Sequence, residues 1–397
     1  KDLQQGDKVI ALSLDVDSDA VASILSEKAA QLNQEAVDNG LVRENGAFKI
    51  IKGEQGIEVN VEDSIAAIEN YISSEWDGGN AEIELVAEVV EPRGSEEDLE
   101  QITDMMGSYT TNYKDSGQNR CDNISNATSK INGTLLYPGE EFSVYEAIGP
   151  LDAANGYELA GAYENGQTVE SYGGGVCQVS TTLYNAVILA ELEITQRSNH
   201  SMIVSYVKPS MDAAIAGDYK DLRFVNNQDI PIYIEGYTEG KNVTFKIYGH
   251  DTRPSNRVVT YESEVVSEQD PGTQYVATGD PAGYMKTAQG KHIGYVARLW
   301  KVVTVDGVEE SREIFNKSTY KASPKIVNVG TASADPNVSA VIGAALATGD
   351  EATINAAVAP YAASAAAILN PAPVEQPSQE EQAITGTVDE SQITGGE

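Results

Sequence analysis

The sequence has few cysteines, histidines and basic residues, and each shortage excludes some classes of fold or function. Its 397 residues include two cysteines and three histidines, which are too few for a disulfide-based scaffold. Lysine and arginine number 26 against 61 aspartates and glutamates, for a formal net charge of −35. Because such a surface repels polyanions, we expect no nucleic-acid partner and no binding to anionic membranes.

Long apolar runs and the usual cofactor motifs are also missing. The sequence has no run of about 18 apolar residues, so we expect no transmembrane segment in this chain. It has no metal-ligand spacing, P-loop or dinucleotide fingerprint. We therefore predict no metal site and no cofactor.

The chain divides by pattern into a multidomain α+β protein. Residues 1–104 predict a small α+β unit, with strands at 9–17, within 48–61 and at 81–90, helices within 18–37 and 62–76, and a connecting helix within 91–100. Residues 105–250 predict a denser α+β domain, and 251–330 an all-β module punctuated by Gly and Pro. The Ala-rich segment 331–370 favours short helices, and 371–397 is typical of a disordered acidic tail.

One stretch, "GGGVCQVSTTLYNAVILAELEI", places a cysteine after a glycine run. The residues after Cys177 have helical spacing, whereas Gly173, Gly174 and Gly175 favour a loop. We therefore expect Cys177 to be the first residue of a helix. Backbone N–H groups and the helix dipole at that position lower the pKa of a thiol, as a nucleophile requires.

A nucleophilic thiol needs a base, and His200 is the candidate. It opens the strand-like segment "SMIVSYV", and a strand returning beside the helix would bring the imidazole to Cys177. Asp212, Asp218 or Asp221 on the following segment could orient the ring. This chain order is that of papain-like and transglutaminase-like enzymes, an analogy at the level of the fold.

The same residues also allow structural roles. Cys177 is either catalytic, a buried structural thiol, or bonded to Cys121 in a disulfide. Arg120 either binds a substrate carboxylate, such as a peptide C-terminus, or pairs with an internal acid. The remaining candidate binding residues flank the helix start and the beginning of the 105–250 domain: Asn119, Gly173, Gly174, Gly175, Gln178, Ser180 and Thr181. Hydroxyls such as these otherwise bond to the helix backbone.

Three segments resemble known families. "NRCDNISNATSKINGTLLYPGEEFSV", the glycine–cysteine stretch and "DLRFVNN" closely resemble the VanW family, known from glycopeptide-resistance gene clusters. Residues 1–104 look like the peptidoglycan-binding domain that often precedes VanW domains. Residues 255–330 resemble a G-five module, with Gly290, Gly307 and Gly330 at its punctuation points.

The resemblance implies an outward-facing protein of the bacterial cell envelope, extracellular or in the cell wall, with peptidoglycan as its partner. Two function classes follow. The first is a protein that binds peptidoglycan or its stem peptides, with a link to glycopeptide resistance. The second is a cysteine-dependent peptidase or acyl transferase that uses Cys177 and His200 on cell-wall peptides.

Overall fold

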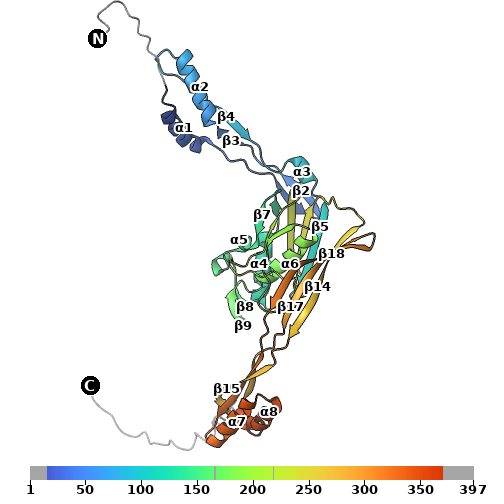
Figure 1. Cartoon of the computed structure of the whole chain (residues 1–397). Coiled ribbons are helices and arrows are strands. Elements are labelled where there is room, and N and C mark those ends of the chain that lie inside the picture. The colour runs from blue at the N-terminus through green and yellow to red at the C-terminus, as the bar shows by residue number, and fades with distance from the viewer. Residues whose placement is uncertain (1–15, 165–166, 218, 370–397) are drawn as a thin grey trace, which may run out of the picture. The chain divides into compact units, whose positions relative to one another are not determined.

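The computed structural model of the protein describes residues 16–164, 167–217 and 219–369. Its elements are labelled in Figure 1. The chain separates into two compact units. Unit 1 comprises Lys1–Glu268 and Gly294–Lys321, and unit 2 comprises Gln269–Ile293 and Ala322–Glu397. The predicted strand at 9–17 lies almost wholly outside the described residues, and the predicted tail at 371–397 lies entirely outside them.

The N-terminal part of unit 1 contains the predicted helices and the strands predicted within 48–61 and 81–90, together with a strand at 40–44 that the pattern did not predict. The helices are α1 (Ser18–Leu32), α2 (Val61–Ser74) and α3 (Glu96–Glu100). The strands are β1 (Gly40–Glu44), β2 (Ala47–Ile51), β3 (Gly56–Val59) and β4 (Ala87–Val90), paired antiparallel as β1–β2 and β3–β4. Asp17 and Asn60 each accept a backbone N–H at a helix start, which explains where α1 and α2 begin.

The centre of unit 1 is a four-stranded antiparallel sheet in the order β5-β13-β12-β6. Its strands are β5 (Asp104–Asn112), β6 (Thr134–Leu136), β12 (Ile232–Glu239) and β13 (Asn242–Gly249). Ile232 and Ile234 enter the main core, whereas Tyr233 between them packs with Leu41 and Leu99. Because side chains alternate along a strand, both faces of this sheet are covered.

Helices α4 (Gln118–Ile131) and α6 (Val176–Leu189) cover the main-core side of this sheet and contact each other (Figure 1). A smaller sheet of β7 (Glu141–Ser143), β10 (Glu193–Gln196) and β11 (Arg223–Val225) has the order β10-β11-β7. The remaining elements are α5 (Val144–Ile148), the 3₁₀ turn η1 (Ala153–Asn155) and the hairpin of β8 (Leu159–Glu164) and β9 (Gln167–Tyr172).

A third sheet completes unit 1. Its order is β14-β17-β18, with β14 (Arg257–Gln269), β17 (Gly294–Val305) and β18 (Val308–Tyr320). Leu299 of β17 is fully buried in the main core, and Tyr261 and Phe315 pack against that core. This sheet therefore shares one hydrophobic core with α4 and α6.

Unit 2 joins a mixed sheet to the Ala-rich segment. The sheet has the order β15-β19-β16, with β15 (Thr273–Pro281), β16 (Met285–Gln289) and β19 (Lys325–Ala332). The helices are α7 (Pro336–Thr348), α8 (Glu351–Val358), η2 (Ala359–Tyr361) and α9 (Ala362–Leu369). Val329, Ile342 and Ile354 are fully buried in their common core.

The mixed α+β class and the all-β character of residues 251–330 are confirmed. The domain boundaries near 104, 250 and 330 stay predictions.

By length and composition alone, Glu351–Leu369 could cross a membrane, with a mean hydropathy of 1.4. A single helix of this kind is weak evidence, and Ile354, Val358 and Ala365 along it are buried inside unit 2. The predicted absence of a transmembrane segment stays a prediction.

Candidate functional site

The glycine run forms the loop that delivers Cys177 to the start of α6. Gly175 is the N-cap, with a φ of 117° that favours glycine. A Cβ on Gly174 would lie 2.5 Å from the carbonyl oxygen of Ala160, so β8 leaves no room for a side chain there. The helix begins at Val176, one residue earlier than predicted, and Cys177 is its second residue. The glycines thus have a packing role in addition to lining the cleft described below.

Both cysteines are free thiols, so the disulfide alternative does not apply to this structure. The Sγ of Cys177 lies 3.4 Å from the backbone N of Ile215, which donates to it, and 3.5 Å from the Ile215 carbonyl oxygen. Cys177 is partly exposed. Cys177 as a residue is therefore not fully enclosed, and it is among the residues that line the cleft described below.

His200 and Asp212 complete the arrangement around the thiol. The Nδ1 of His200 lies 2.7 Å from Oδ2 of Asp212, and the backbone N–H of His200 donates to the same oxygen at 2.7 Å. Both side chains are buried. Because Nδ1 is used by Asp212, the other ring nitrogen, Nε2, is the one left for the thiol.

The electrostatics of the three groups favour their charged forms. Burial by itself raises the pKa of Cys177, but the hydrogen bond and charge of His200 bring the pKa below its usual value. Burial lowers the pKa of His200, but Asp212 and Cys177 outweigh burial and raise that pKa to about 9. Burial raises the pKa of Asp212, yet the hydrogen bond and charge of His200, followed by Arg197, lower that pKa overall. The interactions among the three groups therefore favour the Cys177 thiolate, the His200 imidazolium and the Asp212 carboxylate.

The second oxygen of Asp212 is bound by residues that the sequence did not suggest. Arg197 Nη2 donates to Oδ1 at 3.1 Å, and the hydroxyl of Tyr320 on β18 donates to the same atom. Arg197 also donates from Nε to the carbonyl oxygen of Asp212 and from Nη1 to Oγ of Ser318, which fixes its position. No local pattern could have identified Tyr320, because a long stretch of chain separates it from Asp212.

Of the three predicted orienting aspartates, Asp212 contacts the imidazole. The suggestion of Asp221 is corrected: its carboxylate accepts the hydroxyl of Ser143 at 2.5 Å and the backbone N–H of Tyr145 at 2.9 Å, at the start of α5. Asp218 lies outside the described residues.

The prediction of a strand directly after His200 is wrong. Met202 and Val204 are buried alternately as in a strand, but residues 201–207 form no strand, and this loop covers the core without a sheet partner.

Cys177 and His200 line a cleft of about 1750 Å³. The walls come from residues 112–120, between the end of β5 and the first turn of α4, and from the β8–β9 hairpin, the glycine loop and the segments 200–206, 214–217 and 219–220. The cleft is large enough for a peptide rather than for a single small molecule.

The predicted binding residues divide between the cleft and the core. Arg120 and Gln178 line the cleft, and Arg120 Nη2 donates to Gln178 Oε1 at 2.8 Å. Asn119 also lines it and bonds to the carbonyl oxygen of Leu159. Ser180 and Thr181 are fully buried, which corrects their suggested contact with substrate. Thr181 Oγ1 accepts the backbone N–H of Ala213 at 3.0 Å and so holds the residue next to Asp212.

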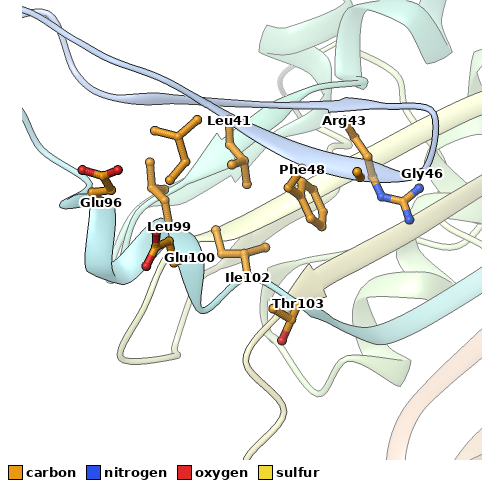
Figure 2. A pocket seen from close by; sticks show the side chains of 11 residues that line it. Leu41, Arg43, Gly46, Phe48, Glu96, Leu99, Glu100, Ile102 and Thr103 are labelled. Atoms are coloured by element: carbon orange, nitrogen blue, oxygen red, sulfur yellow. The ribbon is translucent and has the colours of Figure 1, made fainter.

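A second pocket, of about 580 Å³, lies between the β1–β2 hairpin and α3. Figure 2 shows its apolar side chains, including Leu41, Phe48 and Leu99, together with Arg43. Arg43 is paired with Glu235 at 3.0 Å, so its charge is already balanced. The residues that line this pocket include no cysteine, serine or histidine. No group of three potential metal ligands occurs within 16–164, 167–217 and 219–369.

Three family models match the chain. Residues 119–248 match the model described as "VanW like protein", residues 1–77 match "Putative peptidoglycan binding domain", and residues 260–332 match "G5 domain". The solved G5 domain of an IgA1 protease is 26% identical and covers 19% of this chain and 94% of that domain, with a TM-score of 0.15.

Two curated bacterial proteins are similar in sequence. The uncharacterized protein YoaR of Bacillus subtilis (strain 168) is 30% identical over 237 residues, which cover 59% of this chain and 76% of YoaR. The vancomycin B-type resistance protein VanW of Enterococcus faecalis (strain ATCC 700802 / V583) is 30% identical over 118 residues, 28% of this chain and 42% of that protein.

Together these matches define a cell-envelope protein with three recognisable modules. The chain belongs to the VanW-like family, because it is 30% identical to YoaR and covers more than two thirds of that relative. The family resemblance predicted from the sequence is thereby confirmed.

Proposed function

We propose that the VanW-like domain is a cysteine-dependent peptidase or acyl transferase that acts on cell-wall peptides. The observation that supports this best is the placement of His200, which interacts with Cys177 and contacts Asp212, while Cys177 and His200 both line a peptide-sized cleft. A nucleophile, a base and a group that orients the base are the three parts that covalent acyl transfer requires.

The proposed chemistry uses the charged forms that the interactions among Cys177, His200 and Asp212 favour. The Cys177 thiolate attacks the carbonyl carbon of a substrate amide, forming a C–S bond and a tetrahedral intermediate. As the intermediate collapses, the C–N bond breaks and the proton on His200 Nε2 passes to the leaving amine. The resulting thioester is then released by water, which gives hydrolysis, or by a second amine, which gives transfer. Neutral His200 accepts the proton of the incoming nucleophile in that step.

The flanking modules support a location at the peptidoglycan. The N-terminal match is to a peptidoglycan-binding model, and the G5 match lies beyond the VanW-like domain. In this proposal the flanks bind wall polymer on the outer side of the cell and present stem peptides to the cleft. A relative named for vancomycin B-type resistance supports extending the proposal to wall changes that lower glycopeptide susceptibility.

A binding role without catalysis is the second candidate, and the cleft's tyrosines favour it. Tyr113, Tyr172, Tyr206 and Tyr219 line the cleft, and Tyr172 and Tyr219 are exposed. Tyrosine rings with one apolar face and one polar end are suited to sugars and peptides. Cys177→Ser separates the two candidates, because it removes the nucleophile and leaves the tyrosines in place.

The thiol chemistry is tested by iodoacetamide labelling of the full chain across pH, with each cysteine followed by mass spectrometry. We expect the labelling of Cys177 to reach half its maximum at a pH below the value of about 8.5 that is typical of a free cysteine. His200→Gln should move the Cys177 midpoint upward, because the imidazolium no longer stabilises the thiolate. His250→Gln, on an exposed imidazole, is the control and should leave it unchanged.

Activity has its own pH limits. Incubation with purified peptidoglycan, followed by mass analysis of the soluble peptides, should show new cleavage or transfer products with the wild type and Cys121→Ser but none with Cys177→Ser. The rate should fall above about pH 9, where His200 loses the proton it gives to the leaving amine. If the wild type and Cys177→Ser gave equal amounts of product, Cys177 would not be the nucleophile. The binding role would then be the remaining candidate.

A further inference from the structure

The cleft has the opposite charge balance from the rest of the chain. The whole sequence has 26 lysines and arginines against 61 acidic residues. Among the described residues that line the cleft, the bases are Lys114, Arg120, Lys220 and Lys321, and the acid is Asp115. A basic hollow in an acidic protein raises the local concentration of anions.

Arg120 differs from every other arginine in the chain. Eight of the nine arginines pair with a carboxylate: Arg43, Arg93, Arg197, Arg223, Arg253, Arg257, Arg298 and Arg312. For Arg120, no carboxylate partner occurs among the residues that the structure describes. Its Nη1 donates to Ser116 Oγ at 2.7 Å and its Nη2 to Gln178 Oε1 at 2.8 Å, both neutral acceptors.

The neutral partners hold the guanidinium in place without balancing its charge. Gln178 is buried, and its Nε2 donates to Thr111 Oγ1 and to the carbonyl oxygen of Asn112, each at 3.0 Å. This fixes the amide so that its oxygen accepts from Arg120. Since a guanidinium has five N–H donors, and these two bonds use two of them, donors remain for a ligand in the cleft.

The position of Arg120 relative to the thiol follows from the fold. Gln178 directly follows Cys177 on α6. A Cβ on Gly175 would lie 3.1 Å from Cγ of Arg120, so the stem of the arginine crosses the glycine loop that begins the helix. The charges of both Cys177 and Arg120 act on the hydroxyl of Tyr206, which lines the same cleft. The unpaired guanidinium is therefore close to the reactive sulfur.

We propose that Arg120 is a carboxylate-binding subsite, and that the substrate is a peptide with a free carboxylate near the amide bond attacked by Cys177. The inference rests on the thiol chemistry proposed above and specifies its substrate class. A guanidinium binds a carboxylate through two parallel hydrogen bonds, which gives orientation as well as attraction. The three lysines add a longer-range attraction for the same charge.

The test compares two labelling reagents of nearly the same size, iodoacetate, which has a carboxylate, and iodoacetamide, which is neutral. The measured quantity is the ratio of their rates at Cys177 in the full chain. Arg120→Gln should lower the iodoacetate-to-iodoacetamide ratio about tenfold, as expected for loss of one charge-assisted contact. Arg120→Lys, which keeps the charge, should retain most of the ratio.

Arg312→Gln is the matched control, because it removes the same charge from a surface arginine paired with Glu262 and Glu309. It should change the ratio by less than about twofold. The effect of Arg120→Gln should also shrink as salt is raised, since ions screen the attraction.

The outcomes separate this inference from the proposed function. A ratio that is unchanged in Arg120→Gln overturns the subsite while leaving the thiol chemistry intact. An equal loss of rate with both reagents also overturns it, because Arg120 would then only support the loop. If neither reagent modifies Cys177 in the wild-type protein, the proposed function itself fails.

Discussion

The two sheets matched by the G5 model contribute to different hydrophobic cores. The match spans residues 260–332, yet β14, β17 and β18 belong to unit 1 and β15, β16 and β19 belong to unit 2. The first sheet buries Leu299 in the core that supports α6 and sends Tyr320 to Asp212. The second buries Val329 against the Ala-rich helices. A sequence module is therefore not always a packing unit, and half of this one supports the candidate site.

The largest expected difference between the sheets concerns their cores. Leu299→Ala should lower the free energy of unfolding of unit 1 by about 2–5 kcal/mol through the cavity it leaves. Ile342→Ala, at an equally buried position in unit 2, should cost a similar amount there. Hydrogen exchange followed by mass spectrometry should show lost protection of α6 in the first variant only. An equal loss of protection at α6 in both variants would show that the two units unfold together.

A smaller effect is expected from the hydroxyl of Tyr320. Besides donating to Asp212, it accepts the backbone N–H of Ser210 at 2.7 Å. Tyr320→Phe leaves both groups without this partner in a buried place and should destabilise unit 1 by about 1–3 kcal/mol. Denaturant unfolding measures this loss.

The control is Tyr275→Phe on β15, where the ring packs at the edge of the unit 2 core. A change of less than about 0.5 kcal/mol is expected there. Iodoacetamide labelling of Cys177 provides a second reading: it should slow in Tyr320→Phe, because Asp212 holds His200 less firmly, and stay constant in Tyr275→Phe. A site unaffected by Tyr320→Phe would show that β18 only covers it.

The smallest effect concerns the ion pairs of the two sheets. Glu191 pairs with Arg257 of β14 and Lys301 of β17, and despite burial these bases lower its pKa to about 2. Because the folded-state pKa is below the usual value of about 4.3, the stabilisation is present above that pH and is lost as the pH falls toward 2.

Glu191→Gln should therefore cost about 1 kcal/mol at pH 7 and less at pH 3. Asp270→Asn breaks the exposed pair with Lys291 in unit 2 and should have almost no effect at either pH. Urea unfolding at the two pH values measures both variants. If Glu191→Gln lowered the free energy of unfolding as much at pH 3 as at pH 7, the charge of Glu191 would not be the source of the stabilisation.

Local patterns in the sequence predicted much of the secondary structure. The spacing of apolar residues placed α1 and α2, and the glycine run placed the start of α6 within one residue. The same reasoning failed at residues 201–207. Alternating burial there is real, but a strand also needs a partner edge, and sequence periodicity contains no information about partners.

The candidate site shows the same division. Cys177 and His200 were identified because a chain with two cysteines and three histidines offers few combinations. The choice among the aspartates was not settled by the sequence, since Asp212 and Asp221 both lie on the segment that follows His200. Asp221 is occupied by the start of α5, whereas Asp212 lies where the imidazole, Arg197 and Tyr320 converge.

The sequence by itself determined the charge, the family, the order of the modules and the cysteine at a helix start. These depend on composition, on motifs and on contacts within a few residues. Only the tertiary structure decided which carboxylate orients His200, that β18 belongs to the site, and that Arg120 lacks an acidic partner among the described residues. The physical reason is that each of these depends on which distant segments share a core, and burial of that core selects pairings that no local pattern specifies.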